Sequence, residues 1–185
     1  MLGGNRHRAA GIALAALVAV LGFAGSAVAS GGDRVIQVQD ACDPATFDAA
    51  VGPGTCVRPD HSGRFVTFPE FVARVTEKRS HNAWRFDRDH VTLKAGENLT
   101  VEMGRGGEFH TFSEVKHFGP GCVDFLNALV FPGQGPPFTP VTTCPPDPAE
   151  GVAPGAPALH FRLSRGTHLF QCAIHPWMRS TVTVR

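Results

Sequence analysis

The chain has 185 residues, with 17 lysine and arginine residues against 16 acidic ones, so its formal net charge is only +1. This balance argues against a nucleic-acid-binding protein, which would carry a clear basic excess on one face. A hydrophobic content of 43% with only 18% charged residues excludes a disordered chain. The 21 glycines and 15 prolines are typical of a turn-rich, mainly β protein.

The first thirty residues have the pattern of a secretory signal peptide. Arg6 and Arg8 precede an apolar stretch, and a small-x-small cleavage motif ends at Ala29. The rival interpretation is an uncleaved membrane anchor, but the stretch is shorter than the about 20 apolar residues that a spanning helix needs. We therefore expect removal of residues 1–29, no membrane span in the mature chain, and a periplasmic or secreted protein. Such compartments are oxidising and preserve disulfides.

Residues 30–80 are predicted to hold a first strand and a helical insertion. Apolar and polar residues alternate over 35–39, which indicates a half-buried strand. Asp43, followed by a proline, predicts the start of a brief helix. Thr67, with a glutamate three residues later, predicts a capping box at the start of an amphipathic helix that ends near residue 78.

Residues 81–185 change to a pattern of short strands separated by turns. Strands are expected at 84–86, 91–93, 99–103, 109–115, 159–163, 168–172 and 180–184. Residues 118–157 contain ten of the fifteen prolines and are expected to form a long irregular loop. Strands at short intervals with no helix between them predict an all-β sandwich.

The C-terminal segment carries a spacing typical of a copper site. Cys172, His175 and Met178 follow one another at intervals of three, on a loop between two predicted strands. The fourth ligand is expected from a distant upstream histidine, which His110 supplies. Two imidazoles, a thiolate and a weak thioether make a trigonal copper site with a long axial contact.

The upstream histidine has two competitors. His117 lies close by in sequence, and His90 also begins a predicted strand. We prefer His110 because it lies on the strand after the glycine turn, between Phe109 and Phe112. A cysteine near a histidine and a methionine is often coincidence, but here the ligand types, their order, the strand–loop–strand context and the export signal agree.

With these residues the sequence resembles the cupredoxins, the blue copper proteins that include plastocyanin, pseudoazurin and amicyanin. The short Cys-x-x-His-Pro-x-Met spacing is most similar to that of amicyanin. The resemblance covers about residues 84–185, with 118–157 as an insertion. It implies a cupredoxin-like Greek-key β-sandwich, with a small helical, disulfide-closed N-terminal insertion. Many family members have asparagine after the upstream histidine, where this chain has Thr111.

The resemblance also implies a function. We expect an exported, monomeric type 1 blue copper protein that binds one copper ion and passes single electrons between transient redox partners, without being an enzyme. In the family the downstream histidine reaches the surface within an apolar patch, which implies that His175, with Pro176 and Trp177, is the electron port. The alternative is a periplasmic copper carrier or chaperone without redox turnover.

A multicopper oxidase or a copper nitrite reductase is not indicated. Those families place a histidine directly before the copper cysteine, where this chain has Gln171. No His-x-His pair occurs anywhere in the sequence. A second copper centre is therefore not expected.

The five cysteines are consistent with one metal ligand and two disulfides. If Cys172 is the ligand, the remaining four, Cys42, Cys56, Cys122 and Cys144, allow three pairings. We predict the local pairing, Cys42–Cys56 and Cys122–Cys144, because each bridge then closes a loop within one poorly structured insertion. No Cys-x-x-Cys pair is present, which argues against a zinc site.

Overall fold

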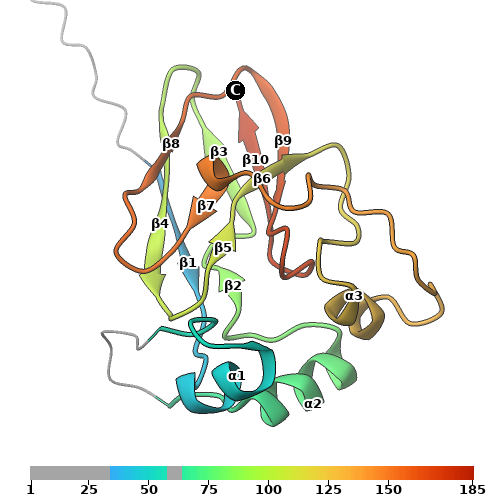
Figure 1. Cartoon of the computed structure of the whole chain (residues 1–185). Helices are drawn as coiled ribbons and strands as arrows, with labels where there is room; N and C mark the ends of the chain where they lie inside the picture. Colours follow the sequence, from blue (N-terminus) through green and yellow to red (C-terminus); the bar gives the residue numbers. More distant parts are fainter. Residues whose placement is uncertain (1–33, 58–63) are drawn as a thin grey trace, which may run out of the picture. The chain divides into compact units, whose positions relative to one another are not determined.

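The computed structural model describes residues 34–57 and 64–185, and this part of the chain is mostly β, with ten strands and three short α-helices (Figure 1). All of these residues belong to one compact unit. The predicted signal peptide, residues 1–29, lies outside the described residues. Among the described helices, none combines the length and the apolar character needed to cross a membrane.

One four-stranded sheet is built around the predicted first strand. Across the sheet the strands are β2 (Arg85–Phe86), β1 (Arg34–Gln39), β4 (Leu99–Arg105) and β8 (Leu159–Phe161). β1 runs parallel to β4, whereas β2 and β8 pair antiparallel with their neighbours. The alternation in β1 buries Ile36 and Val38, so this strand presents one apolar face to the core.

The second four-stranded sheet contains the strands on either side of the predicted copper loop. Its order is β3 (His90–Leu93), β10 (Arg179–Val184), β9 (Gly166–Gln171) and β6 (Ser113–Val115). β9 and β10 are antiparallel, with Gln171 opposite Arg179. Residues 172–178 therefore form the loop that joins two neighbouring strands. A further short pair is formed by β5 (His110–Thr111) and β7 (Gly151–Val152).

Phenylalanine rings join the two larger sheets in the core. Phe112 stacks on Phe170 of β9, with 4.2 Å between ring centroids, and contacts Phe161 of β8 at 5.5 Å. Phe86 of β2 adds an edge contact to Phe112 at 5.0 Å. Both sheets therefore bury their apolar faces against each other, which makes the molecule a two-layer sandwich.

Two helices lie together near one end of the sandwich (Figure 1). α1 (Pro44–Val51) begins where Asp43 accepts a hydrogen bond from the Thr46 N–H, and α2 (Phe68–Lys78) begins with the full Thr67–Glu70 capping box. Both helices pack aromatic side chains on a single core tryptophan. The ring of Trp84 lies 5.7 Å from Phe47 of α1 and 4.7 Å from Phe71 of α2.

Two disulfides close a loop within each of the two insertions. The structure pairs Cys42 with Cys56 and Cys122 with Cys144, and it leaves Cys172 as a buried free cysteine. The first bridge closes a loop that contains α1. The second closes a loop that contains α3 (Asp124–Val130).

The 118–157 segment differs from the expected irregular loop. It contains α3, a 3-10 turn at Pro148–Glu150, and β7. The N-cap residue of α3 is Val123, whose side chain caps nothing, so the sequence carries no capping signal there. The helix is anchored instead by its buried Asn127, which exchanges two hydrogen bonds with the backbone of Gly121.

The single strand expected at 109–115 is divided in two. β5 pairs with β7, whereas β6 pairs with β9. The division occurs at Phe112, whose backbone N–H donates to the carbonyl of Glu150 while its ring enters the core. The chain thus changes pairing partner directly after Thr111.

The His168–Glu114 pair between β9 and β6 gives a pH prediction. A hydrogen bond to Glu114, joined by one to the Ser164 carbonyl, raises the pKa of His168. Because the folded-state pKa is the higher one, this stabilisation is complete below the unfolded-state pKa of about 6.5 and is lost as the pH rises through the folded-state pKa. His168→Gln should therefore lower the free energy of unfolding at pH 5.5, by less than about 1 kcal/mol for such an exposed pair, and have no such effect at pH 9.

Urea unfolding at the two pH values measures this difference. Glu114→Gln, which removes the partner, should give the same pH dependence as His168→Gln. A loss that is equal at pH 5.5 and pH 9 would contradict the assigned ion pair.

Candidate metal centre

The loop between β9 and β10 holds three of the four predicted ligands in a closed turn. The backbone N–H of Cys172 donates to the carbonyl of Met178 at 3.0 Å, and the N–H of Met178 donates to the carbonyl of His175 at 2.9 Å. All three side chains are buried. Hydrogen bonds at both ends of the loop therefore hold the cysteine and the methionine in a defined register.

β5 brings the fourth predicted ligand to this loop from a distant part of the chain. The Thr111 N–H points at the Cys172 sulfur at 3.5 Å, and the Thr111 hydroxyl accepts a hydrogen bond from the Ala173 N–H at 2.8 Å. The two bonds of Thr111 tie the strand of His110 to the cysteine loop.

The donor atoms of two histidines and the cysteine converge at one point. The Cys172 sulfur lies 4.0 Å from Nδ1 of His110 and 3.8 Å from Nδ1 of His175, and the three donor atoms lie within 4.8 Å of one another. Metal bonds of about 2.0 Å to nitrogen and about 2.3 Å to sulfur, as in zinc sites, would separate sulfur from nitrogen by roughly 3.8 Å at a trigonal angle. The spacing therefore fits a single metal ion.

The chemistry of the donors also fits copper. One thiolate, two imidazoles and a thioether combine soft and borderline ligands, which suit both oxidation states of copper. Met178 is 1% exposed and belongs to the same buried cluster as Cys172. His90 and His117, the other candidates for the upstream ligand, are both exposed. Neither belongs to a described cluster of metal-binding side chains.

A buried carboxylate orients the imidazole of His110. Nε2 of His110 lies 2.9 Å from Oδ2 of Asp40, and both side chains are completely buried. Burial by itself lowers the pKa of His110, but hydrogen bonds to Asp40 and Cys172 outweigh it and raise that pKa to about 10. With Nε2 donating to Asp40, Nδ1 faces the cysteine sulfur, as expected of a histidine ligand with a carboxylate partner.

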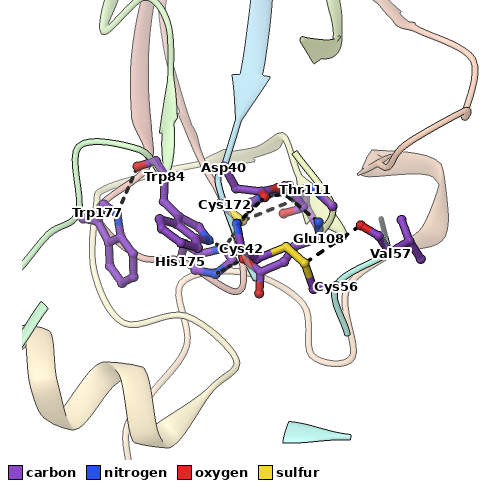
Figure 2. A network of polar contacts seen from close by, with 12 residues as sticks. Asp40, Cys42, Cys56, Val57, Trp84, Glu108, Thr111, Cys172, His175 and Trp177 are labelled. Carbon is purple, nitrogen blue, oxygen red and sulfur yellow. Dashed lines mark hydrogen bonds and ion pairs between the residues drawn. A yellow bond between two sulfur atoms is a disulfide. The ribbon is translucent and has the colours of Figure 1, made fainter. Parts of the chain in front are cut away.

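Asp40 is itself held by the backbone around the first disulfide. Burial raises the pKa of Asp40, but the bond to His110 and backbone bonds outweigh this and leave the pKa below its usual range. Its carboxylate accepts hydrogen bonds from the N–H groups of Cys42, Gly107 and Glu108. Figure 2 shows this network beside the disulfide and the cysteine loop.

The glycine turn before His110 has no room for side chains. A Cβ at Gly107 would meet both sulfurs of the Cys42–Cys56 disulfide at 2.9 Å, and a Cβ at Gly106, where φ is 147°, would collide with the Asp40 carboxylate. The turn must therefore be glycine for Asp40 to reach the ring of His110.

A second buried carboxylate lies behind His175. Oε2 of Glu108 accepts a hydrogen bond from the Trp84 indole N–H and lies 3.7 Å from Nε2 of His175 (Figure 2). Burial raises the pKa of Glu108, against the opposing effect of the two histidines. Each imidazole thus faces the cysteine sulfur through one nitrogen and a buried carboxyl group through the other.

The cysteine is prepared to act as a thiolate. Burial raises the pKa of the Cys172 thiol, but hydrogen bonds and charges from His110 and His175 outweigh it and hold that pKa well below its usual range. Metal ligands bind in their deprotonated forms, so uptake of a metal ion would release protons from this cluster.

Asp40, Glu108 and His110 form a second group whose atoms could hold a cation. Both oxygens of Asp40 already accept two hydrogen bonds each from described residues. A cation would have to displace these bonds in a fully buried position. We therefore interpret this group as the hydrogen-bonded support of the metal centre.

The residues expected to form the electron port are mostly buried. His175 is only 2% exposed and Pro176 is buried, so the imidazole edge does not lie on the surface. The physical reason is the helical insertion. Phe71 of α2 packs edge-on against the His175 ring, and Trp177 is fixed by a hydrogen bond from its indole to the carbonyl of Trp84.

Sequence reasoning missed both carboxylates and the tryptophan. Glu108 is two residues before His110, so its place beside the ligand strand was a usable signal. Asp40 is 70 residues away from His110 in the chain. Only the pairing of β1 with β4 brings Asp40 beside His110, and no local pattern in the sequence indicates this contact.

Comparison with known proteins gives a limited likeness. No protein-family model matches the sequence. No curated protein is significantly similar to it. Among solved structures, a mutant of amicyanin with Cu(I) has a TM-score of 0.30 and 18% identity, over 55% of this chain and 73% of that one. The reduced Cu(I) form at pH 4 of another amicyanin mutant has a TM-score of 0.29 and 20% identity, over 57% of this chain and 77% of that one.

The Asp40 network predicts a large cost for a small substitution. Asp40→Asn replaces one acceptor oxygen by an amide that cannot accept from the buried donors, so the metal-free protein should lose about 2 to 4 kcal/mol of unfolding free energy. Asp87→Asn is the matched control, because exposed Asp87 also accepts a backbone N–H, that of Gln37. It should cost about 1 kcal/mol or less. Chemical denaturation measures both, and equal costs would contradict a structural role special to Asp40.

Proposed function

We propose that this protein is an exported, cupredoxin-like Greek-key β-sandwich that binds one copper ion and carries single electrons between redox partners. The observation that carries the proposal is the fully buried Cys172 sulfur, which has a histidine Nδ1 within 4.0 Å on each of two sides. His110, Cys172 and His175 would hold the ion, with Met178 as the weak axial ligand. Bound copper would supply the exchange between Cu(I) and Cu(II).

The protein's contribution is to keep the ligands in place during that exchange. The two loop hydrogen bonds of Met178 fix one side, and the Thr111 hydroxyl fixes the strand of His110 to the same loop. Asp40 orients the His110 ring. Ligands held by such a network move little when the ion changes charge, which keeps the reorganisation cost of electron transfer low.

An extracytoplasmic location is part of the proposal. Two disulfides in one chain favour an oxidising compartment, the periplasm or the outside of the cell. There we expect a monomer that meets its redox protein partner transiently. Because the sandwich and loop resemble an electron carrier and no second copper centre is expected, we propose no catalytic turnover of its own.

The optical spectrum of the protein with Cu(II) tests the metal centre. We expect an intense visible band from the copper–thiolate bond, and Cys172→Ser should abolish it because the band requires that sulfur. Copper that binds without this band would contradict the proposed ligand set.

The axial position gives a separate prediction. Met178→Leu should keep the visible band and raise the reduction potential, because loss of a sulfur donor destabilises Cu(II) more than Cu(I). Met103→Leu is the matched control, since Met103 lies in β4 outside the ligand loop. Voltammetry should find its potential unchanged. Loss of copper from Met178→Leu equal to that from Cys172→Ser would contradict the axial role.

The alternative function, copper delivery without redox turnover, is distinguished by retention. An electron carrier should keep its copper through repeated reduction by ascorbate and reoxidation in the presence of a Cu(I) chelator. The buried, preformed ligand set favours this outcome. Transfer of the ion to the chelator on the first reduction would favour copper delivery without redox turnover.

A further inference from the structure

A cavity of about 520 Å³ opens beside the metal centre, and no part of the proposed electron transfer uses it. α1, α2 and α3 each contribute side chains to its walls, and Glu108 and His175 are among the other residues that line it. Its volume lies within the roughly 300 to 1,000 Å³ that small-molecule sites occupy. The helical insertion that buries His175 therefore also creates a concave space against it.

The walls of this cavity are aromatic. The largest of its side chains are four phenylalanines, Phe47, Phe68, Phe71 and Phe125. Phe68 meets Phe47 edge-to-face at 5.3 Å and stacks on Phe125 at 6.4 Å. Phe125 is 49% exposed and Val51 is 61% exposed, so apolar side chains also border the opening. Such walls favour a flat aromatic ring, which can stack or make edge contacts with them.

A carboxylate oxygen of Glu108 is available inside the apolar walls. Both contacts of the Glu108 carboxyl group, to Trp84 and to His175, use Oε2. Oε1 has no hydrogen-bond partner among the described residues, yet no described buried side-chain oxygen is left unsatisfied. Oε1 must therefore be accessible, although Glu108 as a whole is only 7% exposed. Because Glu108 lines the cavity, Oε1 is accessible from the cavity.

We propose that this cavity binds a small aromatic molecule that carries a hydroxyl group, of the phenol or hydroquinone class. Its ring would lie among the phenylalanines and its hydroxyl would hydrogen-bond to Oε1 of Glu108. A hydroxyl can donate a hydrogen bond to a carboxylate oxygen, which an ether oxygen cannot do. A ligand seated here would lie against His175, whose other nitrogen faces Cys172.

This inference goes beyond the proposed function and does not depend on copper, so it is tested on the metal-free protein. The probe is 2-naphthol, and 2-methoxynaphthalene is the matched compound that has the same rings but cannot donate. Titrations followed by NMR amide shifts give both dissociation constants. We expect saturable binding, shifts centred on α1, α2 and α3, and an affinity for 2-naphthol roughly threefold to tenfold higher.

Two exposed phenylalanines supply the variants. Phe125→Ala removes a wall of the cavity and should weaken 2-naphthol binding by about twofold to tenfold. Phe109→Ala removes a comparably exposed ring, at 42%, that does not line the cavity, and should leave the affinity unchanged. Because both rings are exposed, neither variant should fail to fold.

Three results would overturn the proposal. Equal affinities for the two probes would mean that Glu108 does not select a hydroxyl, and the cavity would better suit an apolar side chain of a partner protein. Shifts centred away from the three helices, or equal effects of Phe125→Ala and Phe109→Ala, would mean that the ring binds elsewhere. Failure of the copper proposal is recognised separately, by the absence of the visible band.

Discussion

The buried carboxylate of Asp40 is the constraint on which the metal centre depends. It lies just after β1, and its hydrogen bonds reach the first disulfide, the glycine turn and the ring of His110. A buried charge costs several kcal/mol unless its oxygens are paired. Here three backbone hydrogen bonds and the bond from the His110 imidazole offset that cost. One side chain thus joins the first strand, the helical insertion and the ligand strand.

The helical insertion changes the surroundings of the second histidine. Phe71 and Trp177 pack on the His175 ring, and Glu108 takes the position that solvent or a partner would occupy at an exposed histidine. Excluding water there strengthens the electrostatic effect of each nearby charge. The same packing leaves an aromatic cavity as the open space beside His175.

Much of the fold could be predicted because its signals are local. Asp43 and Thr67 predict the starts of α1 and α2. The alternation of apolar and polar residues around Ile36 and Val38 predicts β1. α3 was not predicted because its N-cap residue is Val123, which gives no capping signal, and because its anchor, Asn127, bonds to the backbone of Gly121 outside the helix. The division of the predicted 109–115 strand into two was not predicted either, because distant segments decide whether a residue pairs with β7 or with β9.

The sequence by itself determined the candidate donor set, its order and the number of cysteines left for disulfides. Intervals of three between Cys172, His175 and Met178 place all three on one short loop, whatever surrounds them. Only the tertiary structure decided what stands behind the ligands. Asp40 and Trp84 reach the site through strand pairing and aromatic packing between segments far apart in the chain. Burial, and with it the pKa of each group and the closure of His175 from the surface, is a property of those long-range contacts and has no local pattern.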